Sequence, residues 1–241
     1  MLQTRGLVAG YVPDVDVVHG VDIDVRGGEI VTVVGPNGAG KSTVVKAIIG
    51  LLRPRAGKVL LHGDEITSEK PHRIVARGLG YVPQRDNVFP TMTVEENIEL
   101  GALAHTNGDA RLQPVLELFP QLASRRRQPA GTLSGGERQM LAMARTLIAE
   151  PQIVLLDEPS AGLSPAYVDV IFGKIAEINA RGVTILMVEQ NARRALAMSS
   201  RGYVLDVGRN RFEGSGRELL EDPKVVDLYL GGRGRIDAAP G

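Results

Sequence analysis

A glycine-rich segment near the start of the chain has the residue types and spacing that bind phosphate groups: Gly35-Pro36-Asn37-Gly38-Ala39-Gly40-Lys41-Ser42. Glycines let backbone N–H groups approach a phosphate closely, and a helix N-terminus supplies partial positive charge. Lys41 can reach the β- and γ-phosphates, the Ser42 hydroxyl can ligate Mg²⁺, and the neighbouring Thr43 can contact the α-phosphate. The segment fits G-x-x-x-x-G-K-S/T and predicts a site for a nucleoside triphosphate with Mg²⁺; an ordinary glycine-rich connection is the alternative.

Two carboxylates follow a second apolar run, because residues 153–156 lead directly into Asp157 and Glu158. The run predicts a buried strand, and ligand sites of parallel sheets lie at the carboxyl ends of their strands. Asp157 is thus placed to hold Mg²⁺ through water, and Glu158 to accept a proton from an attacking water. A strand ending in solvated acids is the alternative; the phosphate-binding segment upstream favours the catalytic interpretation.

A second pair of glycines lies in Leu133-Ser134-Gly135-Gly136-Glu137, ahead of a predicted helix that runs to about residue 149. Ser134 and Glu137 have the spacing of a capping box, so a well-capped helix is one interpretation. Capping alone does not require two glycines between the capping residues. We expect Gly135 and Gly136 to leave the first helical turn open to an external anion.

The hydrophobic pattern predicts the elements that must position these residues. Apolar and polar residues alternate over 21–26, as in a half-buried strand, and 29–34 and 183–188 are apolar runs typical of buried strands. Residues 41–49 have helical spacing, and the region 86–148 is mostly helical, with a capping box at Thr93 and Glu96. Strands that alternate with helices predict an α/β protein with a parallel sheet covered by helices.

Composition narrows the class of protein. The 241 residues suffice for one large or two small domains of roughly 100–200 residues each. Lys+Arg and Asp+Glu both total 28, so the global basic field of a nonspecific nucleic-acid binder is missing. The lack of cysteine excludes disulfides, cysteine-ligated zinc and thiol catalysis. No apolar run is long enough to span a bilayer and no signal peptide is present, so we expect a soluble cytoplasmic chain.

Residues 133–139, Leu-Ser-Gly-Gly-Glu-Arg-Gln, resemble the signature sequence of ATP-binding cassette (ABC) ATPases, and they precede the acidic strand as in that family. The resemblance covers the chain to about residue 232. It implies a P-loop NTPase core with a mixed or parallel sheet flanked by helices, an N-terminal antiparallel β-subdomain and an inserted helical subdomain. The expected boundaries are 1–84 and 150–232 for the core with its β-subdomain and 85–149 for the helical subdomain, with a disordered tail at 233–241.

The resemblance also implies roles for individual residues. Tyr11 matches the aromatic residue that stacks on adenine, and Gln84 matches the glutamine that senses Mg²⁺ and the attacking water. Two cassettes pair head to tail, so Ser134, Gly135, Gly136 and Glu137 are expected to bind the ATP held by the partner. Closure on ATP and opening after hydrolysis drive attached membrane subunits.

Gln84 also begins the segment that is expected to touch the membrane subunit. Residues 84–97 are predicted to line a groove for a short cytoplasmic helix of that subunit, with apolar contacts from Val88, Phe89 and Met92. Packing within the helical subdomain is the alternative for these three side chains.

Several stretches resemble one subgroup, the second ATPase of branched-chain amino-acid importers and its urea-importer relatives; they are 88–97, 158–165, 188–191, 202–205 and 229–232. The subgroup implies a related but different second ATPase as partner, with a homodimer as the alternative. It further implies membrane permease subunits, an extracytoplasmic substrate-binding protein as an indirect partner, no nucleic acid, and a place on the cytoplasmic face of the cell membrane. A partner that is an exporter remains an alternative.

Two positions differ from the usual ABC pattern in a way that is typical of this subgroup. Ser164 stands where an aspartate is usual, and Gln190 stands where the switch histidine is usual. Gln190 follows the strand 183–188, which should lie beside the strand that ends at Asp157. We therefore expect Gln190 to face the γ-phosphate and to offer amide donors that carry no charge.

Other nucleotide-binding classes fit the sequence less well. The segment between Lys41 and Ser134 is too short for the coiled-coil insertion of chromosome-type ABC proteins, and the ribosome-acting members carry two cassettes in one chain. Excision-repair members need cysteine-ligated zinc, which this chain cannot form. A regulatory GTPase needs an Asn-Lys-x-Asp motif, which does not occur in this sequence.

Overall fold

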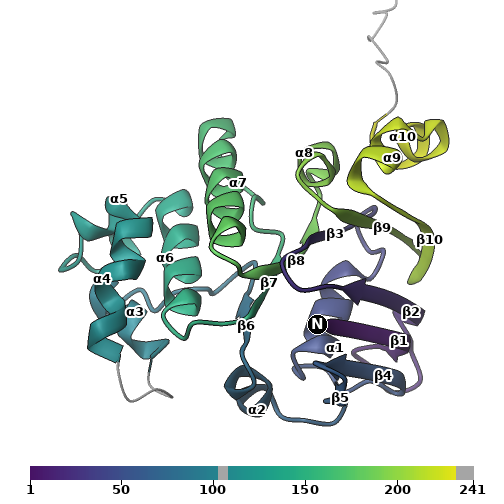
Figure 1. Ribbon diagram of the computed structural model, residues 1–241, viewed down its shortest axis with the longest axis horizontal. Coiled ribbons are helices and arrows are strands. Elements are labelled where there is room, and N and C mark those ends of the chain that lie inside the picture. The colour runs from purple at the N-terminus through teal and green to yellow at the C-terminus, as the bar shows by residue number, and fades with distance from the viewer. Residues whose placement is uncertain (103–107, 232–241) are drawn as a thin grey trace, which may run out of the picture.

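The computed structural model describes residues 1–102 and 108–231, apart from the side chains of 108–110; the predicted disordered tail 233–241 lies outside these residues. Two sheets lie side by side, with a helical region beyond the larger one (Figure 1). The smaller sheet is antiparallel, as predicted, and has the order β2-β1-β4-β5. Its strands are β1 Leu2–Ala9, β2 Val18–Val25, β4 Ala56–Leu61 and β5 Asp64–Glu65.

The larger sheet has six strands in the order β10-β9-β3-β8-β7-β6. All its neighbours are parallel except β9 and β10, so the sheet is mixed. Its strands are β3 Ile30–Val34, β6 Leu79–Val82, β7 Ile153–Asp157, β8 Thr184–Glu189, β9 Arg201–Asp206 and β10 Arg209–Gly214. β3, β7 and β8 are buried throughout, which explains why the sequence has continuous apolar runs there.

Helices cover both faces of the larger sheet. One face packs with α1 Lys41–Ile48 against the smaller sheet. The other face packs against the helices 135–147 and 165–180, and a separate hydrophobic cluster joins β9 to the C-terminal helices. The other helices are α2 Pro71–Ala76, α3 Val94–Leu100, α4 Gly108–Leu118, α5 Pro120–Ala123, the 3₁₀ turn η1 Ala130–Thr132, α6 Gly135–Leu147, α7 Pro165–Ala180, α8 Ala192–Ala197, α9 Gly216–Glu221 and α10 Pro223–Tyr229.

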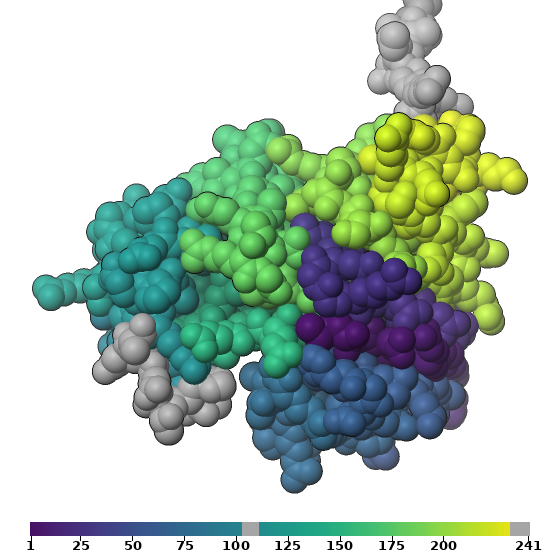
Figure 2. Space-filling view, viewed as in Figure 1, coloured from purple at the N-terminus to yellow at the C-terminus, as the bar shows by residue number. Residues whose placement is uncertain are grey.

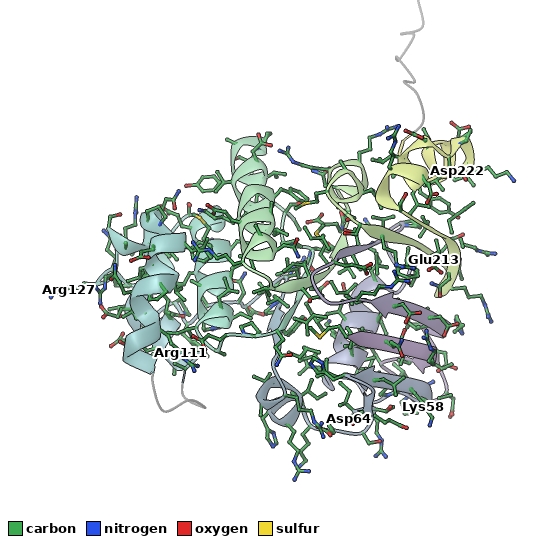
Figure 3. All side chains as sticks on the ribbon, viewed as in Figure 1. Lys58, Asp64, Arg111, Arg127, Glu213 and Asp222 are labelled. Carbon is green, nitrogen blue, oxygen red and sulfur yellow. The ribbon has the colours of Figure 1, made fainter. Side chains whose placement is uncertain are left out.

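The predicted helical middle of the chain is confirmed, and so are both capping boxes, at Thr93 with Glu96 and at Ser134 with Glu137. No helix within residues 1–102 and 108–231 is long and apolar enough to cross a membrane. In Figure 3, Arg127 extends from the outer end of the helical region, away from both sheets. The neighbouring Arg125 and Arg126 pair with carboxylates of the same region.

Strand order places the predicted site residues at one end of the larger sheet. β8 lies between β3 and β7, with Glu189 opposite Val34 and Val188 opposite Asp157. The predicted neighbourhood of β7 and β8 is therefore confirmed. Because these strands are parallel, the segments that follow them emerge at the same edge, and ligand sites of such sheets lie there.

Candidate nucleotide-binding site

The glycine-rich loop between β3 and α1 has a backbone that requires glycine. Gly40, just before α1, has φ +97°, which L side chains rarely adopt. A Cβ at Gly35 would lie 2.1 Å from the Leu205 carbonyl oxygen of β9. The Gly208 N–H, in the β9–β10 turn, donates to the Ala39 carbonyl at 3.0 Å. A distant hairpin therefore holds the loop in its shape before any phosphate binds.

Lys41 reaches back over this loop. Its side chain is 4% exposed, and Nζ donates to the carbonyls of Gly35 at 2.8 Å and Pro36 at 3.1 Å. The same Nζ lies 3.9 Å from Glu158 Oε1. Burial lowers the pKa of Lys41, and nearby carboxylates, Glu158 foremost, act in the opposite direction. The ammonium is thus surrounded by oxygen atoms that a phosphate oxygen could join.

Ser42 and Asp157 provide oxygen ligands of the kind that Mg²⁺ prefers. Ser42 Oγ donates to Asp157 Oδ1 at 2.8 Å, and the Tyr81 hydroxyl donates to Asp157 Oδ2 at 3.4 Å. No cluster of three or more histidine, cysteine or acidic side chains suited to a metal occurs in the described part of the chain. A hydroxyl and one carboxylate fit Mg²⁺ in a site where phosphate oxygens and water complete the coordination.

Glu158 is surrounded by three residues that were predicted for the site, namely Gln84, Gln190 and Lys41. Its side chain is 8% exposed, and Oε2 accepts from Gln84 Nε2 and from Gln190 Nε2, both at 2.8 Å. The residue has φ +48°, a conformation that costs a non-glycine residue free energy and is common at functional sites. The segments after β6, β7 and β8 each supply one of these residues, so the carboxylate is fixed by two neutral donors beside Lys41.

Tyr11 closes the outer side of this pocket, and its side chain is 55% exposed. Thr43 Oγ1 donates to the Tyr11 hydroxyl at 3.4 Å, and Lys46 Nζ lies 5.4 Å from the ring centre. An exposed aromatic face at the rim can stack on a base. The pocket has a volume of about 360 Å³ and is lined by Tyr11, Val17, Asn37, Gly38, Ala39, Gly40, Lys41, Ser42, Thr43, Gln84, Glu158 and Gln190.

The segment 134–137 is absent from the lining of this pocket. Ser134 Oγ accepts from the Glu137 N–H at 3.3 Å, and Glu137 Oε2 accepts from the Ser134 N–H at 2.8 Å. Gly135 is exposed, as expected, whereas Gly136 is buried, so in the single chain only Gly135 leaves the turn open; anion binding by this segment stays a prediction. A Cβ at Gly136 would lie 2.0 Å from the ring of Tyr167, whose packing requires the glycine.

The contact between Gly136 and Tyr167 can be tested by stability measurements. The effect of Gly136→Ala on the free energy of unfolding should change sign when the Tyr167 ring is removed. We expect Gly136→Ala to lower the free energy of unfolding by about 1–2 kcal/mol, because the added methyl overlaps the Tyr167 ring. In a Tyr167→Ala background the same change should instead stabilise by about 0.5–1 kcal/mol, because alanine has the higher helix propensity. Denaturant unfolding of the four proteins measures both effects. The same effect in both backgrounds would contradict the packing argument.

Two further residues border the site without having been predicted. Tyr81 contacts Asp157 because β6 lies beside β7, and no local pattern reveals that contact. Glu189, 1% exposed, follows Val188 at the end of β8. The rule that sites lie at the carboxyl ends of parallel strands could have indicated Glu189.

Comparisons with known proteins agree with this geometry. The family model described as "ABC transporter" matches residues 18–161, more than half of the chain. The "Probable branched-chain amino acid transport ATP-binding protein LivF" of Archaeoglobus fulgidus is 45% identical, covering 96% of this chain and 99% of that protein. The "High-affinity branched-chain amino acid transport ATP-binding protein BraG" of Pseudomonas aeruginosa is 43% identical, covering 93% and 97%.

The fold has solved counterparts. The crystal structure of the ADP conformation of MJ1267, an ATP-binding cassette of an ABC transporter, superposes with a TM-score of 0.86 and 29% identity. The match covers 96% of this chain and 98% of that one. The α/β architecture with its phosphate loop is thus that of an ABC ATPase, as predicted. The chain belongs to the ABC transporter family of ATP-binding cassettes.

Proposed function

We propose that this chain is the ATP-hydrolysing subunit of an importer of branched-chain amino acids. The observation that carries the proposal is the convergence of Lys41, the Ser42–Asp157 pair and Glu158 around one pocket. The relatives named above support the cargo, since both are described as branched-chain amino acid transport ATP-binding proteins.

The side chains of the pocket have separate roles in binding and hydrolysing ATP. Backbone N–H groups of residues 35–40 and the Lys41 ammonium bind the phosphates, and Tyr11 stacks on the adenine. Ser42 and Asp157 would hold Mg²⁺, which would neutralise charge on the phosphates. Gln84 donates its amide N–H to Glu158, which leaves the amide oxygen free for Mg²⁺ or its water. Glu158 accepts the proton of the attacking water.

A second cassette completes each ATP site in this proposal. Ser134, Gly135, Gly136 and Glu137 lie outside the pocket of their own chain, which supports their use on nucleotide held by the partner. The partner is a related but different ATPase; a second copy is the alternative. Membrane permease subunits and, through them, an extracytoplasmic substrate-binding protein complete the importer at the cytoplasmic face of the membrane. No nucleic acid takes part.

The domain arrangement is part of the same proposal. Residues 1–232 form one ABC ATPase domain, in which 85–149 is the helical subdomain inserted into the core formed by 1–84 and 150–232. The helices α3 to α6 share one hydrophobic cluster with the outer face of the larger sheet, which supports a single unit.

A groove beside β6 is the proposed docking site for a short helix of the permease. It has a volume of about 500 Å³, and its lining includes Leu51, Val75, Tyr81, Phe89, Leu100 and Arg145. The surface is indented between α2 and the helical region (Figure 2). Phe89 is 50% exposed and lines the groove, which supports docking through this segment, whereas Val88 and Met92 do not line it.

Phe89 allows a direct test of docking. We expect Phe89→Ser to weaken binding to the permease by about 1.5–3 kcal/mol, or roughly 10–150-fold in Kd, because the ring loses its burial in the complex. MgATP binding by the isolated chain should not change. Leu228→Ser is the matched control, since Leu228 is 68% exposed and outside the groove. Equal effects of the two substitutions on assembly would contradict docking through Phe89.

Testing which cargo is transported, and in which direction, requires a reconstituted complex. The chain is co-expressed with a candidate second cassette and candidate permease subunits, and the complex is placed in liposomes with a candidate binding protein. We expect ATP-dependent uptake of leucine, isoleucine and valine, and none of urea. Uptake of urea alone, or ATP-driven efflux, would reassign the transporter, and failure of the complex to hydrolyse ATP would overturn the proposal.

A further inference from the structure

Glu189 is a buried carboxylate that the proposed chemistry does not use. It ends β8 and is 1% exposed. A buried charge is costly unless its oxygens are satisfied. No ion pair joins it to a lysine, arginine or histidine among the residues that the structure describes. Its stabilisation must therefore come from hydrogen bonds.

Four donors from two loops meet on this one carboxylate. Oε1 accepts from the Ser160 N–H at 2.9 Å. Oε2 accepts from the Ser160 hydroxyl at 2.9 Å, the Gln190 N–H at 3.0 Å and the Asn191 N–H at 3.1 Å. Ser160 comes two residues after Glu158, and Gln190 donates its side-chain amide to Glu158. The Glu189 carboxylate thus connects the loop after Glu158, the proposed base, to the loop of Gln190, which donates a hydrogen bond to that base.

We propose that Glu189 is a positioning residue, which holds the segments of Glu158 and Gln190 in register so that the Gln190 amide reaches the Glu158 carboxylate. The proposal rests on the function proposed above for Glu158. The two loops have few other ties: the Glu158 N–H donates to the Val188 carbonyl at 2.9 Å, which fixes the base but not Gln190. Without the Glu189 carboxylate, the Gln190 N–H and the Ser160 N–H and hydroxyl lose their common acceptor.

The ionised form of Glu189 is the one that accepts all four bonds, since a protonated carboxyl carries a hydrogen on one oxygen. Burial raises the pKa of Glu189, and the bonds from Ser160, Asn191 and Gln190 oppose this. Lys41 of α1 interacts electrostatically with Glu189, as it does with Glu158 and Asp157 at the end of β7. Loss of a donor should raise the pKa further.

Glu189→Gln tests the role by turnover. An amide has one oxygen, so its NH₂ group must face at least one backbone N–H. In the assembled transporter we expect a kcat about 10–150-fold lower, as for a lost hydrogen bond to a charged group, with the KM for MgATP changed less than about threefold. Glu221→Gln, on the exposed surface of α9, is the matched control and should leave both constants unchanged. Unchanged kcat in Glu189→Gln overturns the inference, and so does a higher KM with normal kcat.

Ser160→Ala provides a milder variant that keeps the carboxylate. It removes one donor from Glu189 but leaves Gln84, Gln190 and Lys41 around Glu158. The raised pKa of Glu189 should move the acidic limb of the kcat profile to higher pH, while MgATP affinity stays unchanged. An acidic limb at the wild-type position overturns the inference.

A crystal structure of Glu189→Gln supplies a readout that does not need hydrolysis. We expect the Gln190 amide to move out of hydrogen-bond distance of Glu158; a retained bond overturns the inference even where turnover has fallen. If the wild-type complex itself fails to hydrolyse ATP, the proposed function fails, and this structure still decides whether Glu189 positions Gln190.

Discussion

Glu158→Gln should bind MgATP with nearly unchanged affinity and hydrolyse it about 10²–10⁴-fold more slowly, the usual effect of losing a general base. The reason lies in the contacts of the carboxylate. Glu158 receives two amide donors and faces Lys41, so a glutamine of the same shape fills the same space but cannot take a proton. The phosphate loop and the Ser42–Asp157 pair keep their geometry, which is why binding should persist.

Nucleotide binding and turnover are measured separately, by fluorescent-nucleotide titration and by phosphate release in the assembled transporter. Slow hydrolysis should also trap an ATP-bound dimer, visible by size-exclusion chromatography. Glu213→Gln, an exposed glutamate of β10, controls for the loss of one charge. Near-normal phosphate release by Glu158→Gln would remove Glu158 from its role as base.

Gln190→Ala should lower kcat by roughly 10–150-fold, since a hydrogen bond to a charged group contributes about 1.5–3 kcal/mol. The structure places the Gln190 amide 2.8 Å from Glu158 Oε2, where it orients the base. MgATP affinity should change little, because the phosphate loop does not depend on this bond. Gln128→Ala, at an exposed position of the helical region, is the control.

Gln190→His extends this test to the pH dependence of kcat. An imidazole at this position keeps a donor but changes charge near pH 6.5, so the variant should gain a titration in its kcat profile that the wild type lacks. Unchanged turnover in Gln190→Ala, or identical profiles for Gln190→His and wild type, would show that the position does not act on Glu158.

The parts of the site that a local pattern encodes were predictable. The phosphate loop is contiguous in sequence, and its glycines, lysine and serine have fixed spacing. Glu158 and Gln190 follow apolar runs, so the rules for parallel sheets suffice to bring them together. The structure confirms this neighbourhood, with both side chains in one hydrogen-bonded cluster.

The parts that depend on packing between distant segments were not predictable. Tyr167 of α7 covers Gly136 of α6, and neither residue carries a sign of the other in the sequence. The same holds for Tyr81 against Asp157, a contact between neighbouring strands far apart in the chain. Phe89 borders the groove whereas Val88 packs into the helical cluster, because the turn that precedes α3, not hydrophobicity, decides which side chain points outward.

The hairpin that holds the phosphate loop also makes a natural reporter of it. The Gly208 N–H is bonded to the Ala39 carbonyl, so its hydrogen cannot exchange with solvent deuterium unless this contact opens. Exchange at one amide of the β9–β10 turn therefore measures how often the phosphate loop opens, although the two residues are far apart in sequence. The protection factor of that amide in the nucleotide-free protein would give the free energy of opening the empty loop. Its increase with MgATP would give the additional free energy that the bound nucleotide contributes to the closed loop.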